Sequence, residues 1–136
     1  MPSSSAGGPN LPFARHVGLR MEEPREGTGR CVLSIDEHHH NSAGIVHGGV
    51  LFTLADTAMG AALYSTLAPG EGCATIEMKI NYFKPVVAGT VVCTAGIVNK
   101  GRTIASLEAS VHVDEVLVAK ANGTFSIFRR KPEATT

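Results

Sequence analysis

The sequence lacks an excess of charge of either sign. Its 136 residues include 12 basic and 12 acidic side chains, so the formal net charge is zero. No overall field therefore draws the chain to nucleic acid or to an anionic membrane surface, and any anionic ligand must be held by local charges. The length and a hydrophobic content of 43% fit one ordinary globular domain. We expect neither a nucleic-acid partner nor a membrane partner.

Cysteine is scarce, and its spacing shows no pairing pattern. The chain has three cysteines, Cys31, Cys73 and Cys93, which is an odd number without a CxxC pair. Each lies in an apolar or alternating run, where a small buried hydrophobic side chain fits. We expect all three to be reduced and structural, which favours a cytoplasmic protein.

No segment has the pattern of a secretory signal or of a clear membrane span. Residues 1–10 have neither a basic start nor an apolar core, and we expect a disordered leader there. The longest apolar run, residues 50–67, is interrupted by Asp56 and Gly60 and is marginal against the roughly 20 residues that span a bilayer. We therefore place a single domain at residues 11–130 and a flexible tail at 131–136.

The clearest feature that is present is the pattern of a long apolar helix. We expect this helix at about residues 50–66, because two glycines precede it and the turn APGEG follows it. It is apolar nearly all round, and a helix of that kind has to be enclosed by other elements. A curved antiparallel sheet would enclose it.

Five segments have the period-two alternation of half-buried strands. Before the long helix, GRCVLSID follows a short helix expected within residues 12–27. After it come ATIEMKINYF, GTVVCTAGIV, RTIASLEASVHV and VLVAKANGTFSIF, the last three as a meander. In ATIEMKINYF the alternation places Ile76, Met78, Ile80 and Tyr82 on one face, and Thr75, Glu77, Lys79 and Asn81 on the other. The prediction is an α+β fold in which about five strands wrap one central helix.

A core this thin for the chain length favours self-association. An exposed edge strand that pairs across a two-fold axis would extend the sheet and hide the edge at the same time. We therefore expect a homodimer.

Asp56 is the single charge in the long helix. An aspartate is rarely buried without a partner, so its place in an apolar helix suggests a working group. The alternative is an aspartate on a narrow solvated stripe. The turn before the helix favours the first interpretation, because Gly48 and Gly49 leave backbone N–H groups unshielded where an oxyanion could bind. A merely flexible helix start is the alternative there.

Two polar side chains precede the glycines. Asn41 and His47 could position a substrate or a water, although an asparagine or histidine in a loop is more often a solvated cap. Together with the glycines and Asp56 they form a constellation of amide, imidazole, oxyanion donors and carboxylate.

These residues match a known pattern. The stretch NSAGIVHGG, whose histidine precedes Asp56 in LADTA by nine residues, is followed by ATIEMKINYFKPV and KGRTIASLEASV. In these motifs the chain resembles the hotdog-fold acyl-CoA thioesterases of the phenylacetate-pathway type, over about residues 29–128. The resemblance implies a helix wrapped by an antiparallel sheet, and hydrolysis of an acyl-CoA to a free acid and coenzyme A. We expect no cofactor and no metal.

The resemblance also implies roles for single residues. Asp56 becomes the nucleophile or the general base, and Gly48 gives the main oxyanion N–H, with Gly49 beside the substrate. Asn41 and His47 hold the thioester or the attacking water. The remaining assignments are Thr75 as a hydroxyl near the carboxylate, and Lys100 and Arg102 near the phosphates of coenzyme A. From their apolar character alone, we expect an acyl pocket lined by Phe52, Met59, Leu63 and Tyr64. Lys100 and Arg102 could instead be ordinary turn cations, and the pocket would accept aromatic or medium-chain acyl groups alike.

One chain is not expected to form a complete site. At 1.5 Å of rise per residue, Gly48 and Asp56 are about 12 Å apart along one helix, too far to act on one carbonyl. A two-fold dimer with antiparallel helices would bring Asn41, His47 and Gly48 of one subunit to Asp56 of the other. The resemblance implies the same dimer, commonly paired again into a tetramer.

The sequence has features that could suggest three other functions. His38, His39 and His40, with His47 nearby, could suggest a metal site, but consecutive histidines point in different directions and no carboxylate or thiol has ligand spacing beside them. A non-catalytic acyl-CoA-binding or regulatory protein could share the fold, but binding alone does not require a buried carboxylate. A hotdog hydratase would use a different local pattern.

Overall fold

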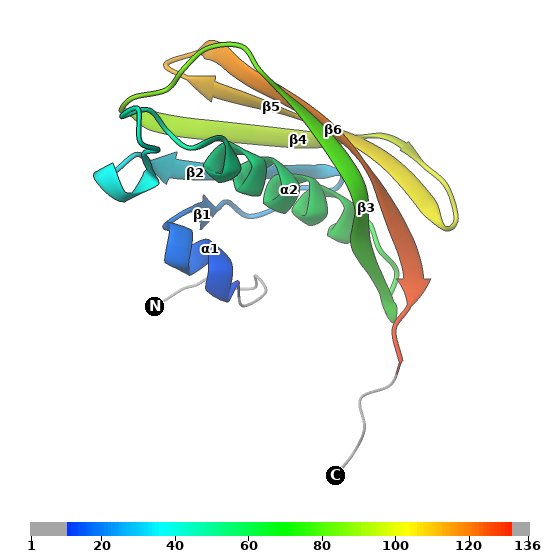
Figure 1. The fold of residues 1–136 in the computed structure, drawn as a ribbon. Coiled ribbons are helices and arrows are strands. Elements are labelled where there is room, and N and C mark those ends of the chain that lie inside the picture. Colours follow the sequence, from blue (N-terminus) through cyan, green and yellow to red (C-terminus); the bar gives the residue numbers. More distant parts are fainter. Residues whose placement is uncertain (1–10, 132–136) are drawn as a thin grey trace.

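One long helix, α2 (Gly48–Tyr64), lies against the concave face of a curved antiparallel sheet (Figure 1). This computed structural model describes residues 11–131. The leader predicted at residues 1–10 lies outside the described residues. The tail predicted at 131–136 also lies outside them, except for residue 131. The predicted α+β arrangement of a central helix wrapped by a sheet is confirmed.

The sheet has six strands in the order β1-β2-β4-β5-β6-β3, rather than about five. The additional strand is β1, which has two residues and pairs with β2. A strand this short carries no alternation that a sequence pattern could reveal. The strands are β1 (Arg20–Met21), β2 (Thr28–Ser34), β3 (Glu71–Tyr82), β4 (Thr90–Lys100), β5 (Ile104–Val113) and β6 (Val116–Arg129). The short helices are α1 (Pro12–Val17) and the 3-10 turn η1 (Glu37–His39).

Helix α2 begins and ends two residues earlier than predicted. His47 is its N-cap, and the ring Nδ1 of His47 accepts a hydrogen bond from the N–H of Gly49 at 2.8 Å. This cap satisfies a donor at the start of the helix, so the two glycines join its first turn. Within residues 11–131, no helix has both the length and the apolar composition to cross a bilayer.

The sheet covers α2 on one side and leaves a stripe uncovered. The buried residues of the helix form its sheet-facing side: Leu51, Leu54, Ala55, Ala58, Met59, Ala62 and Leu63. On the other side, the side chains of Phe52 and Tyr64 are 38% and 52% exposed. Asp56 and Gly60 lie between them at one-turn spacing and are half-buried. We call Phe52, Asp56, Gly60 and Tyr64 the uncovered stripe of α2.

The helix packs closely against the sheet at Gly29 of β2. A Cβ at Gly29 would lie 2.2 Å from the carbonyl oxygen of Ala58 and 2.9 Å from the backbone nitrogen of Ala62. Backbone therefore packs on backbone at this point, which only a residue without a side chain allows.

Strand β3 is an edge strand with an irregularity in its middle. It pairs with β6, and the pairing shifts register between Thr75 and Glu77, so Ile76 is an extra residue. Thr75 lies opposite the buried Phe125, on the helix side of the sheet. The prediction that Thr75 faces away from Met78, Ile80 and Tyr82 is therefore wrong, because strict alternation cannot anticipate a bulge.

The three cysteines are unpaired. Cys31 and Cys93 are fully buried neighbours on β2 and β4. A hydrogen bond with Cys31, together with burial, raises the pKa of the Cys93 thiol far above its usual range. Burial also raises the pKa of the half-buried Cys73. Protonated, enclosed thiols of this kind are unreactive packing groups.

The contact at Gly29 can be tested by Gly29→Ala. The added methyl group has to push α2 away from β2, and we expect the free energy of unfolding to fall by about 1–3 kcal/mol, as for other overpacked cores. Urea unfolding followed by circular dichroism measures this loss. Gly96→Ala on the neighbouring strand β4 is the matched control, because a Cβ there lies 3.9 Å from the nearest atom, the carbonyl oxygen of Gly27. Equal losses in both variants would contradict a special contact at Gly29.

Candidate active site

Asp56 lies where the uncovered stripe of α2 meets the edge strand β3. The hydroxyl of Thr75 donates a hydrogen bond to Oδ1 of Asp56 at 2.7 Å. Within residues 11–131, Oδ2 of Asp56 has no hydrogen-bond partner and is left for another group. The bulge at Ile76 makes this contact possible, because it turns Thr75 to the helix side. The structure thus brings together the carboxylate and the hydroxyl that the resemblance had placed near each other.

The first turn of α2 leaves one backbone N–H without a protein partner. Gly48 is the first residue of the helix, and in the described part of the chain nothing accepts a hydrogen bond from its N–H. The N–H of Gly49 is different, since it already donates to His47. Of the two glycines, Gly48 is therefore the one that can donate to a substrate oxygen.

Tyr82 holds the same turn from the side of β3. Its hydroxyl donates to the carbonyl oxygen of Gly48 at 2.7 Å, and a Cβ on Gly48 would lie 3.0 Å from its ring. Desolvation by burial raises the pKa of Tyr82, so the hydroxyl stays protonated and remains a donor. The peptide unit between Gly48 and Gly49 is thus bound at its carbonyl by Tyr82 and at its N–H by His47. Nothing in the sequence links Tyr82 to the glycines, because Tyr82 lies 34 residues after Gly48. The alternation of the strand predicted only that Tyr82 shares a face with Met78 and Ile80.

Asn41 and His47 shape the loop in front of the helix. Oδ1 of Asn41 accepts from the N–H groups of Ala43 and Ile45, at 2.8 and 3.3 Å. The side-chain amide of Asn41 has no partner within residues 11–131. His47 accepts at Nδ1, so its neutral ring carries the proton on Nε2, and this side chain is exposed. Each of these two side chains therefore accepts a hydrogen bond from the backbone and keeps an N–H donor that has no partner in the described part of the chain.

Two other histidines near this loop, His39 and His40, are bound to backbone. The buried His39 accepts at Nδ1 from the N–H of Asp36 at 2.9 Å, and its Nε2 lies 2.7 Å from the carbonyl oxygen of Val17. His40 bonds the carbonyl oxygen of Val87 through Nε2 at 2.8 Å. The described residues contain no group of three or more His, Cys, Asp or Glu side chains that could hold a metal ion.

The predicted substrate-binding side chains lie apart. Phe52 is on the uncovered stripe, whereas Met59 is fully buried, with its methyl group 3.2 Å from the Cβ position of Gly123 on β6. Lys100 donates from Nζ to the carbonyl oxygen of Thr66 at 2.9 Å, just beyond the end of α2. Arg102 is exposed in the turn between β4 and β5. The structure does not bring these four residues together.

The polar groups instead form two clusters beside helix α2. Asn41, His47, Gly48 and Tyr82 gather at its N-terminus, while Asp56 and Thr75 lie two turns further along. Because Asp56 is eight positions after Gly48, the two are about 12 Å apart along the helix axis. One cluster contains a carboxylate, and the other contains an N–H that could bind an oxyanion.

Comparisons with known proteins fit this geometry. The family model described as the thioesterase superfamily matches residues 43–120, which is more than half of the chain. Human acyl-coenzyme A thioesterase 13 is 34% identical over 95 residues, which are 68% of this chain and 67% of that protein.

Two solved structures have the same fold. A conserved protein of Pseudomonas aeruginosa is 35% identical with a TM-score of 0.84, over 88% of this chain and 95% of that one. The PaaI protein from the phenylacetic acid degradation operon of E. coli is 25% identical with a TM-score of 0.80, over 93% and 89%. The resemblance seen in the sequence is confirmed. The chain belongs to the thioesterase superfamily, and it is a thioester hydrolase with the hotdog fold.

Proposed function

We propose that this protein hydrolyses an acyl-CoA thioester to a free acid and coenzyme A. The observation that carries the proposal is the carboxylate of Asp56, which Thr75 holds through Oδ1 while Oδ2 stays without a protein partner in the described chain. Such a carboxylate is oriented for work on a substrate. The name of the human relative, an acyl-coenzyme A thioesterase, supports the choice of thioester.

The chemistry needs two groups on opposite sides of one carbonyl. Asp56 either attacks the thioester carbon, expelling the thiolate and leaving an anhydride that water then hydrolyses, or removes a proton from a water that attacks instead. In both cases negative charge develops on the carbonyl oxygen, and the N–H of Gly48 receives it at the positive end of the helix. The spare donors of Asn41 and His47 hold the thioester or the water.

A single site requires two subunits. The 12 Å that separates Gly48 and Asp56, by helical rise, is too long for one carbonyl, so Gly48 of one subunit has to meet Asp56 of another. Phe52 lies midway between them in the chain, so in an antiparallel helix pair the two-fold axis passes near Phe52. This accounts for a large apolar side chain that is 38% exposed on the uncovered stripe. The free edge of β3 pairs with its own copy in the same dimer.

The proposed function also includes an assembly, an acyl pocket and a cellular compartment. Two such dimers pair into a tetramer, as the resemblance implies. The exposed Phe52 contributes to an acyl pocket that suits aromatic or medium-chain groups, while Met59 supports it from the core. The three unpaired cysteines fit a reducing compartment, and we place the protein in the cytoplasm.

The role of Asp56 is tested by Asp56→Asn. The amide can still accept the hydrogen bond from Thr75, so the fold should persist, but the nucleophile or base is lost. We expect kcat for acyl-CoA to fall by at least about 100-fold with little change in KM. Release of free thiol measures turnover, and thermal unfolding checks the fold. Turnover near that of the wild type would remove Asp56 from the mechanism.

The shared site is tested with mixed dimers of Asp56→Asn and Gly48→Pro subunits. Proline fits the first position of a helix but removes the N–H, and its ring also displaces Tyr82. Each parent should be inactive. A mixed dimer that carries two different tags has one site with both parts intact, so it should regain about half of the wild-type activity per dimer.

The matched control is a mixed dimer in which one subunit carries both substitutions and the other subunit is wild type. There every shared site has one defective part, and activity should stay at the level of the parents. Purified Asp56→Asn/Gly48→Pro mixed dimers that stay as inactive as both parents would overturn the shared site.

The role of Tyr82 is tested by Tyr82→Phe. Without the hydroxyl, the Gly48 carbonyl loses its outer hydrogen bond and the adjoining turn is less well fixed. We expect kcat to fall by about 10-fold, with KM unchanged, because orientation of the oxyanion donor matters mainly in the transition state. Thr124→Val is the control, since the hydroxyl of Thr124 also bonds a residue of β3, Glu77, but on the far side of the sheet. A rise in KM with constant kcat would instead assign Tyr82 to substrate binding.

A further inference from the structure

Helix α2 has one glycine beyond its first turn, Gly60. The helix runs without a break from Gly48 to Tyr64, and its other two glycines, Gly48 and Gly49, begin it. Glycine stabilises the interior of a helix less than alanine does, because its backbone has more freedom to lose. A glycine at position 60 therefore needs a reason that outweighs this loss of stability.

The fold of the subunit does not supply that reason. Gly60 has a helical backbone and is not among the glycines with a positive φ angle. In the described chain, a Cβ at this position would meet one atom outside the helix, Cε2 of Phe125, at an ordinary contact distance of 3.9 Å. Gly29 is the opposite case, since a Cβ there would overlap the backbone of α2. Alanine would thus fit at position 60 but not at position 29.

Gly60 lies beside the carboxylate of the candidate site. It follows Asp56 by four positions, so the two share one side of α2 and are about 6 Å apart along its axis. The sheet gives a second link, because the ring of Phe125 borders the Gly60 position and Phe125 pairs with Thr75 on β3. Thr75 in turn donates to Asp56. The missing side chain leaves a gap next to Asp56, with the edge of the Phe125 ring at its floor, which we call the Gly60 gap.

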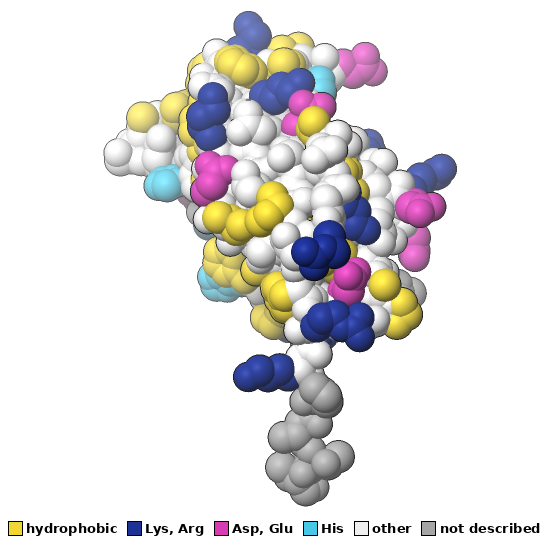
Figure 2. Space-filling model, turned by 90° about the vertical axis from the view of Figure 1, so that its right-hand side faces the viewer, with side chains coloured by type: hydrophobic (Ala, Val, Ile, Leu, Met, Phe, Trp, Pro, Cys, Tyr) yellow, Lys and Arg dark blue, Asp and Glu magenta, His cyan; other side chains and the backbone are white. Residues whose placement is uncertain are grey.

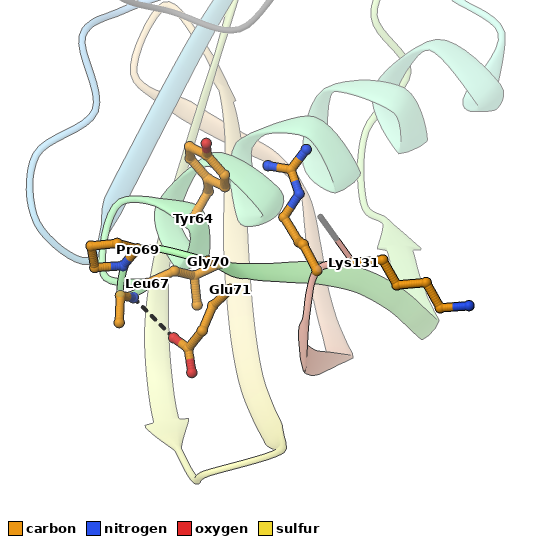
Figure 3. Close-up of a pocket in the computed structure, with 8 residues that line it drawn as sticks. Tyr64, Leu67, Pro69, Gly70, Glu71 and Lys131 are labelled. Atoms are coloured by element: carbon orange, nitrogen blue, oxygen red, sulfur yellow. Dashed lines mark hydrogen bonds between the residues drawn. The ribbon is translucent and has the colours of Figure 1, made fainter. Parts of the chain in front are cut away.

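The Gly60 gap is bounded at its far end by Tyr64. This tyrosine follows Gly60 after one turn on the uncovered stripe and stands at the end of α2 (Figure 3). Beyond it the surface carries charges of both signs, from Glu71, Arg130 and Lys131. Figure 2 shows basic and acidic side chains close together at this end of the molecule, which is the lower end in that view. An apolar group beside Asp56 is therefore favourably placed only as far as Tyr64.

In the proposed dimer, the helix of the partner subunit does not fill the gap. The two-fold axis passes near Phe52, so a residue eight positions after Phe52 faces the residue eight positions before it in the partner. Gly60 therefore faces position 44, which precedes the start of the helix at Gly48. A thioester held between Asp56 and Gly48 of the partner subunit has the Gly60 gap at its side.

We propose that Gly60 is a specificity-determining residue, because the side chain that it lacks leaves room for the acyl group of the substrate beside Asp56. This inference rests on the proposed function, since it concerns the same site and the same thioester. The pantetheine arm fits the gap less well, because its amides need hydrogen-bond partners and the Phe125 ring at the floor offers none. An acetyl group has one carbon beyond the carbonyl and makes little use of the gap, whereas a longer chain fills it.

Gly60→Ala tests the role of the gap. The substitution should raise the midpoint of thermal unfolding by about 2–5 °C, because alanine favours the helix. It should also lower the ratio of kcat/KM for hexanoyl-CoA to kcat/KM for acetyl-CoA by about tenfold or more, since the added methyl group takes the place of substrate atoms. Release of free thiol measures both reactions. A glycine with a merely structural role would not change the ratio between two acyl groups.

Gly96→Ala on β4 is the matched control. A Cβ there also lies 3.9 Å from its nearest atom, the carbonyl oxygen of Gly27, but it does not border the gap. This variant should leave the ratio unchanged. Sedimentation then checks the assembly of Gly60→Ala. Dissociation of its subunits, or an equal fall in kcat/KM for both acyl groups, would overturn the proposal, because Gly60 would then serve a subunit contact or a part that all substrates share.

Binding to the Asp56→Asn variant separates this proposal from the proposed function. In this background, calorimetry should show that Gly60→Ala raises Kd for hexanoyl-CoA about tenfold more than Kd for free coenzyme A. Hydrolysis of both acyl groups in a ratio that does not respond to Gly60 would overturn the gap and leave the function standing. Hexanoyl-CoA binding that depends on Gly60, in a wild-type chain that hydrolyses no acyl-CoA, would support the gap and overturn the function. A chain that neither binds nor hydrolyses hexanoyl-CoA would overturn both.

Discussion

The backbone of α2 meets the backbone of β2 at Gly29, and the rest of the structure depends on this close approach. Since a Cβ there would lie 2.2 Å from the carbonyl oxygen of Ala58, only glycine lets the helix sink into the concave sheet. Buried alanines on α2 and on strands β4, β5 and β6 keep the packing of the helix against the sheet close. A helix seated so deeply keeps its buried side fully packed, and one narrow stripe of it faces away from the sheet. Asp56, the carboxylate of the candidate site, lies on that stripe.

The bulge in β3 makes the edge of the sheet part of the site. Without the extra residue Ile76, the hydroxyl of Thr75 would point to the outer face, away from Asp56. With it, Thr75 and Tyr82 both face the helix and contact it two turns apart, at Asp56 and at Gly48. One strand thus positions the carboxylate and the helix start in a fixed relation, which a rigid catalytic arrangement requires.

Charge is distributed to match this layout. The chain is neutral as a whole, but Lys100, Arg130 and Lys131 lie near the C-terminal end of α2. At the N-terminal end, the N–H of Gly48 has no partner within the described residues. Helix α2 therefore has a free backbone N–H at its start, a carboxylate in its middle and cationic side chains near its end.

The sequence by itself determined the central helix, the five longer strands and the isolated charge at Asp56, because periodicity and composition are local properties that the chain shows directly. It also determined the distance of about 12 Å between Gly48 and Asp56, since the rise of a helix is the same for any sequence. Only the tertiary structure decided which face Thr75 occupies, that Tyr82 bonds Gly48, and that His47 caps the helix through the N–H of Gly49. A bulge changes the face of a residue without changing the pattern of letters, and contacts between residues far apart in the chain arise only when strands pair and pack on the helix.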